Sequence, residues 1–272
     1  MKITYLGTAA SMGFPGVFCN CRFCREARRL GGKNIRTRSQ SLINDDLLID
    51  FPADSYGHFL NNGIEPDKIK YLFITHSHRD HLCTDDLDTR HGVYAYDMRA
   101  EELKIYCSTG AFEKIKALPV QEGFSTTLIK PYEKIILDGY EIIPLPARHF
   151  EGDGAVIYII KSEGKTLLYG NDTGFFYEEI FDFIEKEKLY FDLISLDCTY
   201  ADHPVSDSGG HMGIENINRL IGRLAEISAV DEKTEKYLTH FSHKFEPLQQ
   251  VLETKAARFD LKVAFDGAKI EI

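Results

Sequence analysis

Long apolar runs, internal repeats and low-complexity linkers are all missing from this 272-residue sequence. No stretch approaches the ~18 consecutive apolar residues typical of a membrane-spanning helix, so a membrane is not an expected partner. Met1-Lys2 leads directly into an apolar run without the hydrophobic core of a signal peptide, and we expect a cytoplasmic protein. With 43% hydrophobic residues and no linker, the chain is expected to form one domain over residues 1–272.

Positive charge is also scarce, because 32 Lys and Arg stand against 42 Asp and Glu, a net charge of −10. Nucleic-acid binding depends on Lys and Arg that neutralise phosphates, so nucleic acid is not an expected partner. The basic residues cluster between positions 22 and 38. Such a cluster is usually a solvated face, but it can also steer a phosphorylated substrate.

Half of the six cysteines lie in one short segment, as Cys19, Cys21 and Cys24. In a cytoplasmic protein, clustered cysteines bind metal more often than they form disulfides, and three thiolates leave one position in a tetrahedral zinc site. His243 is the candidate fourth ligand. The spacing therefore predicts a structural zinc knuckle at residues 19–24. The alternatives are three unrelated surface thiols or a redox C-x-x-C pair, although no βαβ pattern follows the segment.

Four metal-ligand residues within positions 76–81 directly follow an apolar run that is typical of a strand. Alternate residues of an extended segment point the same way, so His76 and His78 can bind one ion. If the chain then turns, Asp80 and His81 reach a second ion. Two ions about 3.5–4 Å apart can stabilise both the attacking and the leaving oxygen of a displacement. The alternative is a polar loop of solvated histidines.

Three further apolar runs also end in a ligand-type residue, namely His149, Asp172 and His240. Each one alone is typical of a turn aspartate or of a hydrogen-bonded histidine. Together they supply the remaining ligands that a two-metal site needs.

The motif His-x-His-x-Asp-His at 76–81, followed by a distant His, an Asp and a final His, resembles the metallo-β-lactamase superfamily. The resemblance extends over nearly the whole chain and implies an α/β layered fold, the αββα sandwich. It also implies two divalent metal ions at the catalytic site, and Zn, Mn and Fe all accept such ligands. The ligand sets that it implies are His76, His78 and His149 for one ion, Asp80, His81 and His240 for the other, and Asp172 as the bridge.

The cysteine segment resembles one branch of that superfamily, the phosphonate-pathway cyclic phosphodiesterases, which cleave phosphoribosyl 1,2-cyclic phosphate. That branch carries a Cys-x-Cys-x-x-Cys segment near its N-terminus and a histidine three residues after the last catalytic histidine, as His243 follows His240 here. The B-type proteins of pyrroloquinoline-quinone biosynthesis have a similar cysteine segment, and Gly13-Phe14-Pro15 resembles them. They depart from the full histidine motif, which this chain keeps.

His211 lies in a glycine-rich loop, residues 209–213, that precedes a stretch with helical apolar spacing. Glycines allow close approach to a ligand, and the N-terminus of a helix favours an anion. In the phosphodiesterase branch and in the related tRNA 3′-processing enzymes, a histidine in this region assists the leaving oxygen. The resemblance therefore implies a catalytic role for His211, alongside Asp80. The alternative is a helix-start histidine without a chemical role.

Two other segments bear on specificity. Asp50 stands where the superfamily often has a buried structural aspartate, but the small residue and glycine that usually follow are replaced by Phe51-Pro52. The segment Leu82 to Arg99 is acidic and then aromatic, and it is a candidate lid or homodimer contact.

The function expected from these patterns is that of a metal-dependent hydrolase, a phosphodiesterase acting on a small phosphorylated substrate, with cyclic phosphate esters among the candidates. The first alternative is an RNase Z-like RNA 3′-processing nuclease, although the long basic insertion that would hold RNA is missing from the sequence. The second is a thioester or lactone hydrolase on the same scaffold. The third is a non-catalytic cofactor-biosynthesis protein of the pyrroloquinoline-quinone B type, against which the complete second ligand set argues.

Overall fold

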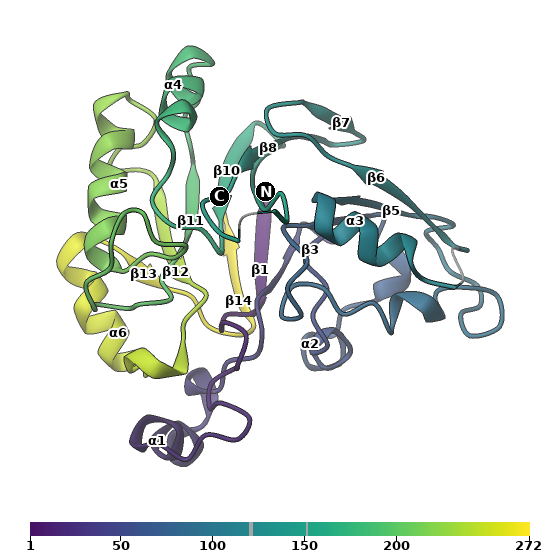
Figure 1. Ribbon diagram of the computed structural model, residues 1–272, viewed down its shortest axis with the longest axis horizontal. Helices are drawn as coiled ribbons and strands as arrows, with labels where there is room; N and C mark the ends of the chain where they lie inside the picture. The colour runs from purple at the N-terminus through teal and green to yellow at the C-terminus, as the bar shows by residue number, and fades with distance from the viewer. Residues whose placement is uncertain (120–121, 151) are drawn as a thin grey trace.

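Two seven-stranded β-sheets pack face to face in the computed structural model, with helices on both outer faces (Figure 1). The structure describes residues 1–119, 122–150 and 152–272. The expected αββα sandwich is therefore confirmed. No helix in these described ranges is both long enough and apolar enough to cross a membrane.

The first sheet is antiparallel at one end, where β14, β1, β2 and β3 pair, and parallel from β3 to β6. Its strands, in spatial order, are β14 (Ala268–Glu271), β1 (Lys2–Gly7), β2 (Gln40–Ile43), β3 (Leu47–Ile49), β4 (Tyr71–Ile74), β5 (Leu103–Cys107) and β6 (Phe124–Leu128).

The second sheet is parallel from β13 to β10 and antiparallel from β10 to β7. Its strands, in spatial order, are β13 (Lys262–Val263), β12 (Glu235–Thr239), β11 (Leu193–Asp197), β10 (Lys165–Gly170), β9 (Val156–Ser162), β8 (Tyr140–Pro146) and β7 (Ile135–Leu137).

Helices cover the outer faces unequally. Two pack on the first sheet, α2 (Ser55–Asn62) and α3 (Thr109–Lys116), and three pack on the second, α4 (Glu178–Lys186), α5 (Ile214–Glu226) and α6 (Gln249–Ala256). The remaining helix, α1 (Arg22–Leu30), belongs to an arm that projects from the sandwich (Figure 1). Single 3₁₀ turns lie at Gly32–Asn34, Pro66–Lys68, Leu87–Thr89, His243–Phe245 and Ala257–Phe259.

Central strands such as β4 and β9 are almost continuously apolar because both of their faces are covered. In β9, Tyr158 packs with Tyr5 and Phe73 between the two sheets, whereas Ile157 and Ile159 face the outer layer of helices. Alternate residues of one strand thus serve two different cores. All of these side chains are at most 2% exposed.

Local turn chemistry decides where several strands end. A two-residue turn joins β9 to β10, and Glu163 and Gly164 both take positive φ, as such a hairpin requires. The strand-rich segment 41–50, in contrast, is divided into β2 and β3, because Asn44 takes a φ of 51° and reverses the chain.

A matched pair of isoleucines tests this core. Ile159 is fully buried, and we expect Ile159→Ala to lower the free energy of unfolding by about 2–5 kcal/mol through lost contacts and a cavity. Ile136 in β7 is 68% exposed, so the same substitution there should cost less than about 0.5 kcal/mol. Urea denaturation of both variants measures the difference. Equal costs would contradict the assignment of β9 to the core.

Candidate metal centre

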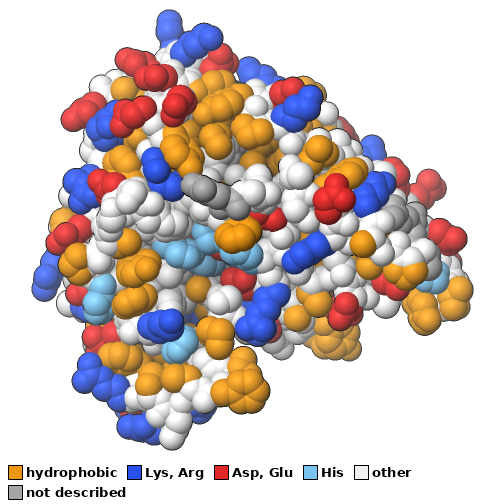
Figure 2. Space-filling model, in the orientation of Figure 1, with side chains coloured by type: hydrophobic (Ala, Val, Ile, Leu, Met, Phe, Trp, Pro, Cys, Tyr) orange, Lys and Arg blue, Asp and Glu red, His pale blue; other side chains and the backbone are white. Residues whose placement is uncertain are grey.

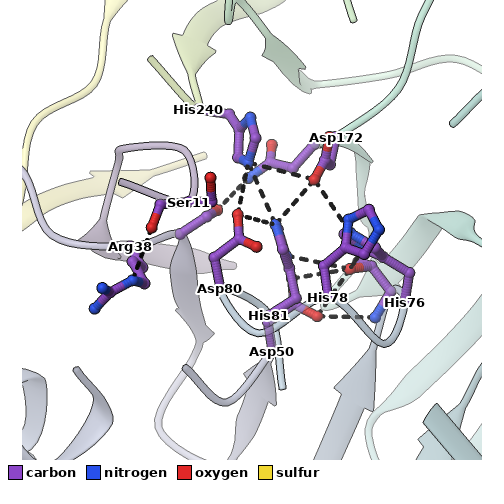
Figure 3. A network of polar contacts seen from close by, with 12 residues as sticks. Ser11, Arg38, Asp50, His76, His78, Asp80, His81, Asp172 and His240 are labelled. Carbon is purple, nitrogen blue, oxygen red and sulfur yellow. Dashed lines mark hydrogen bonds and ion pairs between the residues drawn. The ribbon is translucent and has the colours of Figure 1, made fainter. Parts of the chain in front are cut away.

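The predicted ligands come from segments far apart in the sequence, and the ends of neighbouring strands bring them together. His76 follows β4, His149 follows β8, Asp172 follows β10 and His240 follows β12. These strand ends meet at one edge of the sandwich, so the side chains converge there (Figure 3). The 76–81 loop is continuous with β4 and adds its other donors to the same place.

The first donor set consists of three imidazoles and one carboxylate. His78 Nδ1 lies 3.0 Å from His76 Nε2 and 3.1 Å from His149 Nε2. With Asp172, these side chains offer donor atoms that all lie within 4.8 Å of one another. Imidazole nitrogens converging in this way fit a transition-metal cation.

The second donor set is buried more deeply and consists of Asp80, His81, Asp172 and His240. His81 Nε2 lies 3.3 Å from His240 Nε2 and 3.4 Å from Asp80 Oδ2. The set therefore has two imidazoles and two carboxylates, a donor composition that also fits a divalent cation.

Asp172 faces both donor sets with a single oxygen. Its Oδ2 lies 3.3 Å from His76 Nε2, 3.0 Å from His81 Nε2 and 3.4 Å from His240 Nε2. Its other oxygen, Oδ1, is buried and accepts no hydrogen bond of good geometry from the described residues. A buried carboxylate with spare acceptor capacity between two imidazole groups fits a position between two cations.

Backbone conformation aims several of these side chains. Asp172 and His240 take φ values of 57° and 61°, and Asp50 takes 64°. Residues other than glycine adopt this left-handed region only when the surrounding structure holds them there, and such residues cluster at functional sites. All three follow directly after a strand or lie one residue beyond it, where the chain turns away from the sheet.

A second group of carboxylates holds the donor residues in place. Asp50 Oδ2 lies 2.6 Å from His81 Nδ1, which leaves Nε2 of that ring for the donor set, and Thr75 N–H donates to Asp50 Oδ1. Asp153 accepts a hydrogen bond from Ser77 N–H at 2.7 Å. A Cβ at Gly110 would lie 1.6 Å from Asp153 Oδ1, so only glycine leaves room for this contact.

The sequence predictions missed Asp197, which ends β11. Its Oδ2 lies 3.0 Å from His211 Nδ1 and 3.2 Å from His240 Nδ1, and Met212 N–H donates to its Oδ1. The signal was present, because Leu193–Leu196 is an apolar run that ends in an aspartate, as the run before Asp172 does. Asp197 therefore connects the His211 loop to the second donor set.

His211 lies beside the donor sets and also lines a pocket of about 240 Å³. Its Nδ1 is 3.0 Å from both Asp197 Oδ2 and Asp172 Oδ1, which leaves Nε2 as the nitrogen available to a ligand. Tyr200, Lys244 and Phe245 line the same pocket, and the Tyr200 and Phe245 rings stack at 4.6 Å. The predicted site residue thus lies between the metal-ligand residues and a space for a small molecule.

The carboxylates and imidazoles shift one another's protonation. Burial opposes charge on His211, but Asp197 and Asp172 outweigh it and raise its pKa to about 11. Burial is outweighed in the same way at His240, where Asp172 and Asp197 raise the pKa to about 9. Burial lowers the pKa of His76 to about 4. Despite its burial, Asp172 has its pKa held well below the ordinary value by His240 and His211.

The cysteine segment forms a second cluster in the projecting arm. The sulfur atoms of Cys19, Cys21 and Cys24 lie within 4.8 Å of one another, and Gly16 N–H donates to Cys24 Sγ. Burial raises the pKa of the Cys24 thiol to about 12, so a cation is needed to stabilise a thiolate there.

His243 is not one of the donors within that 4.8 Å group, but it lies next to it. A Cβ at Gly16 would lie 3.1 Å from Cys19 Cβ and 3.4 Å from the His243 ring. His243 Nδ1 is buried and has no hydrogen-bond partner among the described residues. An unpartnered buried nitrogen beside three thiols fits a fourth zinc ligand, and this role stays a prediction.

The chain belongs to the metallo-β-lactamase superfamily, since the family model described as "Beta-lactamase superfamily domain" matches residues 49–241. This match includes every residue of the first and second donor sets. The chain is therefore a hydrolase-like protein of that fold with His/Asp clusters of the metal-binding kind.

Two curated relatives differ greatly in how much of the chain they match. Coenzyme PQQ synthesis protein B of Acinetobacter baumannii is 26% identical over an alignment that covers 100% of both chains. An octanoyltransferase of Porphyromonas gingivalis is 38% identical over 94 residues, which are 33% of this chain and 18% of that protein. The matched part is thus a small fraction of the octanoyltransferase.

Solved structures show the same fold at low sequence identity. Zinc-bound PqqB from Methylobacterium extorquens superposes with a TM-score of 0.76 at 16% identity, covering 100% of both chains. A diphosphatase of the PhnP family superposes with a TM-score of 0.74 at 22% identity, covering 100% of this chain and 97% of the other.

Proton competition gives a first test of the second donor set. With its pKa near 9, His240 of the chelated protein holds a proton at pH 7, and a cation must displace it. We expect the affinity for the catalytic metals to rise with pH between 6.5 and 8.5, by up to roughly tenfold per unit for each proton released. Chelator competition at several pH values measures the affinity. Calorimetry in buffers of different ionisation enthalpy measures the number of protons released on binding. An affinity independent of pH would contradict the protonated imidazole.

Metal content tests the knuckle. We expect His243→Ala to weaken zinc binding at the cysteine cluster, so that mild chelation removes one more ion per chain than it removes from the wild type. His203→Ala is the matched control, because His203 is about half exposed in a neighbouring loop. Elemental analysis after a timed chelator challenge measures the difference. Equal retention in both variants would exclude His243 as a ligand.

Proposed function

We propose that this protein is a metal-dependent phosphodiesterase that acts on a small phosphate ester through a dinuclear metal centre. The observation that carries the proposal is the position of Asp172 Oδ2, which faces two complete donor sets at once. Zn or Mn, with Fe as a third choice, suits these catalytic ligands, and zinc suits the cysteine knuckle.

The charge around the site supports an anionic substrate. Although the chain has a net charge of −10, Lys and Arg side chains stand at the rim of the hollow that holds the histidines (Figure 2). Arg79 is exposed within the motif itself, Lys114 donates to the carbonyl of Ser77, and Lys244 lines the pocket beside His211. Such a rim attracts a phosphate and raises its local concentration.

Each group has a distinct part in the reaction. Two divalent cations held by the donor sets would supply an activated water and neutralise charge that develops on the phosphoryl oxygens. His211 donates a proton from Nε2 to the leaving oxygen, and Asp197 holds its Nδ1 and stabilises the imidazolium. Asp80 contributes its carboxylate to the second set.

The size of the pocket supports a small leaving group. A volume of about 240 Å³ suits a sugar-sized fragment, including the ring of a cyclic phosphate, better than a length of RNA. Its walls combine the stacked rings of Tyr200 and Phe245 with the Lys244 ammonium group, so one side of the leaving group meets an aromatic face. Nucleic acid is therefore not a proposed partner.

A cytoplasmic location is part of the proposal. All six cysteines are free thiols, and the cytoplasm keeps thiols reduced and available to zinc.

The full-length similarity to coenzyme PQQ synthesis protein B favours a second candidate, a role in the synthesis of a quinone cofactor. The two candidates differ in the catalytic metals that they need. Two ions per chain at the His/Asp sets, beside the knuckle zinc, support the phosphodiesterase, whereas a single ion confined to the cysteines supports the second candidate.

A phosphodiester panel that includes cyclic ribose phosphates, run with defined metals, tests the proposed activity. We expect His211→Ala to lower kcat by roughly 10²–10⁴-fold on substrates with a poor leaving group, because the proton donor is lost. Substrates with an acidic leaving group should be much less affected, and His203→Ala should keep wild-type turnover. Full turnover in metal-loaded Asp172→Ala would contradict the mechanism, and inactivity on the whole panel would contradict the proposed function.

A further inference from the structure

The projecting arm exposes a large apolar side chain at its surface. Phe18 is 97% exposed and its neighbour Val17 is 57% exposed. They precede α1, and the arm leaves the sandwich on the side where α2 lies (Figure 1). An apolar side chain as exposed as that of Phe18 is typical of a residue that packs against another molecule.

A pocket of about 470 Å³ lies elsewhere on the same chain, between α2 and the segment 82–99. Its lining is mostly apolar and includes Leu48, Phe51, Phe59, Leu72, Tyr94 and Tyr96. Tyr94 and Tyr96 are 68% and 71% exposed, so apolar surface continues from the pocket onto its rim. The volume is ample for a phenylalanine side chain and part of its backbone.

The arm around Phe18 is positively charged. Arg22, Arg25 and Arg28 are exposed on α1, and none of the three pairs with a carboxylate within the described ranges. Arg25 donates to the backbone carbonyl of Asn20, and Arg28 donates to those of Cys19 and Gly16. Their charge is therefore available to a partner.

Segment 82–99, which forms one wall of the pocket, carries unpaired negative charge. Asp85, Asp86 and Asp97 are exposed in the 82–99 segment, and Asp86 also lines the pocket. Over the part of the chain that the structure describes, these three carboxylates have no ion pair. An exposed apolar side chain beside unpaired cations, and an apolar pocket with unpaired carboxylates in one of its walls, are complementary in polarity and charge.

We propose that two copies of this chain form a reciprocal dimer in which Phe18 of each copy enters the pocket between α2 and segment 82–99 of the other. The arm and α2 lie on the same side of the molecule, so a two-fold axis can form both contacts at once (Figure 1). In such an isologous interface both copies use the same two surfaces, so neither Phe18 nor the pocket is left free to bind a third copy.

The proposed pocket also touches the metal centre. Phe51 lines the pocket, and its N–H donates to the carbonyl of His81 at 2.7 Å. Cys83 N–H in turn donates to the carbonyl of Phe51. A partner docked here thus packs against the residue that fixes the end of the 76–81 loop.

Sedimentation velocity of the metal-loaded 272-residue chain, over a series reaching high micromolar concentration, tests the proposal. We expect a dimer whose Kd rises roughly tenfold or more in Phe18→Ser, because a central buried aromatic is lost. Arg22→Asp and Asp86→Arg should each weaken the dimer, and combining them should restore part of the affinity. Ile136→Ser removes an equally apolar exposed side chain from β7 and should change nothing. Circular dichroism and metal content check the folding of each variant.

Hydrogen exchange at low and high protein concentration locates the interface. Raising the concentration should slow amide exchange in residues 12–25 of the projecting arm and in segment 82–99. A wild type that stays monomeric throughout, or a dimer that Phe18→Ser and Asp86→Arg leave unchanged, overturns the proposal. Open-ended polymers that grow with concentration overturn its reciprocal form. If Phe18→Ser does not fold, the Arg22→Asp and Asp86→Arg variants decide alone. A dimer that each single variant weakens and the double variant does not restore contradicts the proposed pairing.

Discussion

The structure depends on a buried carboxylate, Asp172, at the point where the ends of both sheets meet. One of its oxygens lies 3.0 to 3.4 Å from three imidazole nitrogens, two from the 76–81 loop and one from His240. A buried negative charge is costly unless positive charge surrounds it, and imidazolium groups or cations supply that charge here. The order of the strands and the left-handed turns after them all bring donor side chains to this one oxygen.

Around that centre, other aspartates hold the ligand-type residues in position by hydrogen bonds and stand outside the two donor sets. Asp50 fixes one nitrogen of His81, Asp153 holds the backbone of the 76–81 loop, and Asp197 holds both His211 and His240. Asp50 and Asp197 fix the direction in which a donor nitrogen points, and Asp153 fixes the loop that carries His76 and His78. The geometry of the site is thus set by hydrogen bonds to the far side of each ligand.

One short segment joins the metal centre to the arm. His240 belongs to the second donor set, and three residues later His243 lies against the cysteine cluster. Ser242, Lys244 and Phe245 line the pocket beside His211, so loosening the knuckle would disturb both that pocket and a residue of the second donor set. The arm therefore contributes to two surfaces. Its end next to the sandwich borders the pocket beside His211, and its outer end carries Phe18.

The sequence by itself determined the ligand-type residues, because a histidine or aspartate at the end of an apolar run is a local signal, and the sandwich followed from the family resemblance that those residues carry. Asp197 carried that signal too, yet its importance depends on contacts with His211 and His240, which lie 14 and 43 residues away in the chain. The division of segment 41–50 at Asn44, and the short helices α2 and α3, also depended on packing against the first sheet. Only the tertiary structure decided which nitrogen of each histidine faces the centre and that Phe18 stands exposed, since both follow from contacts between distant segments.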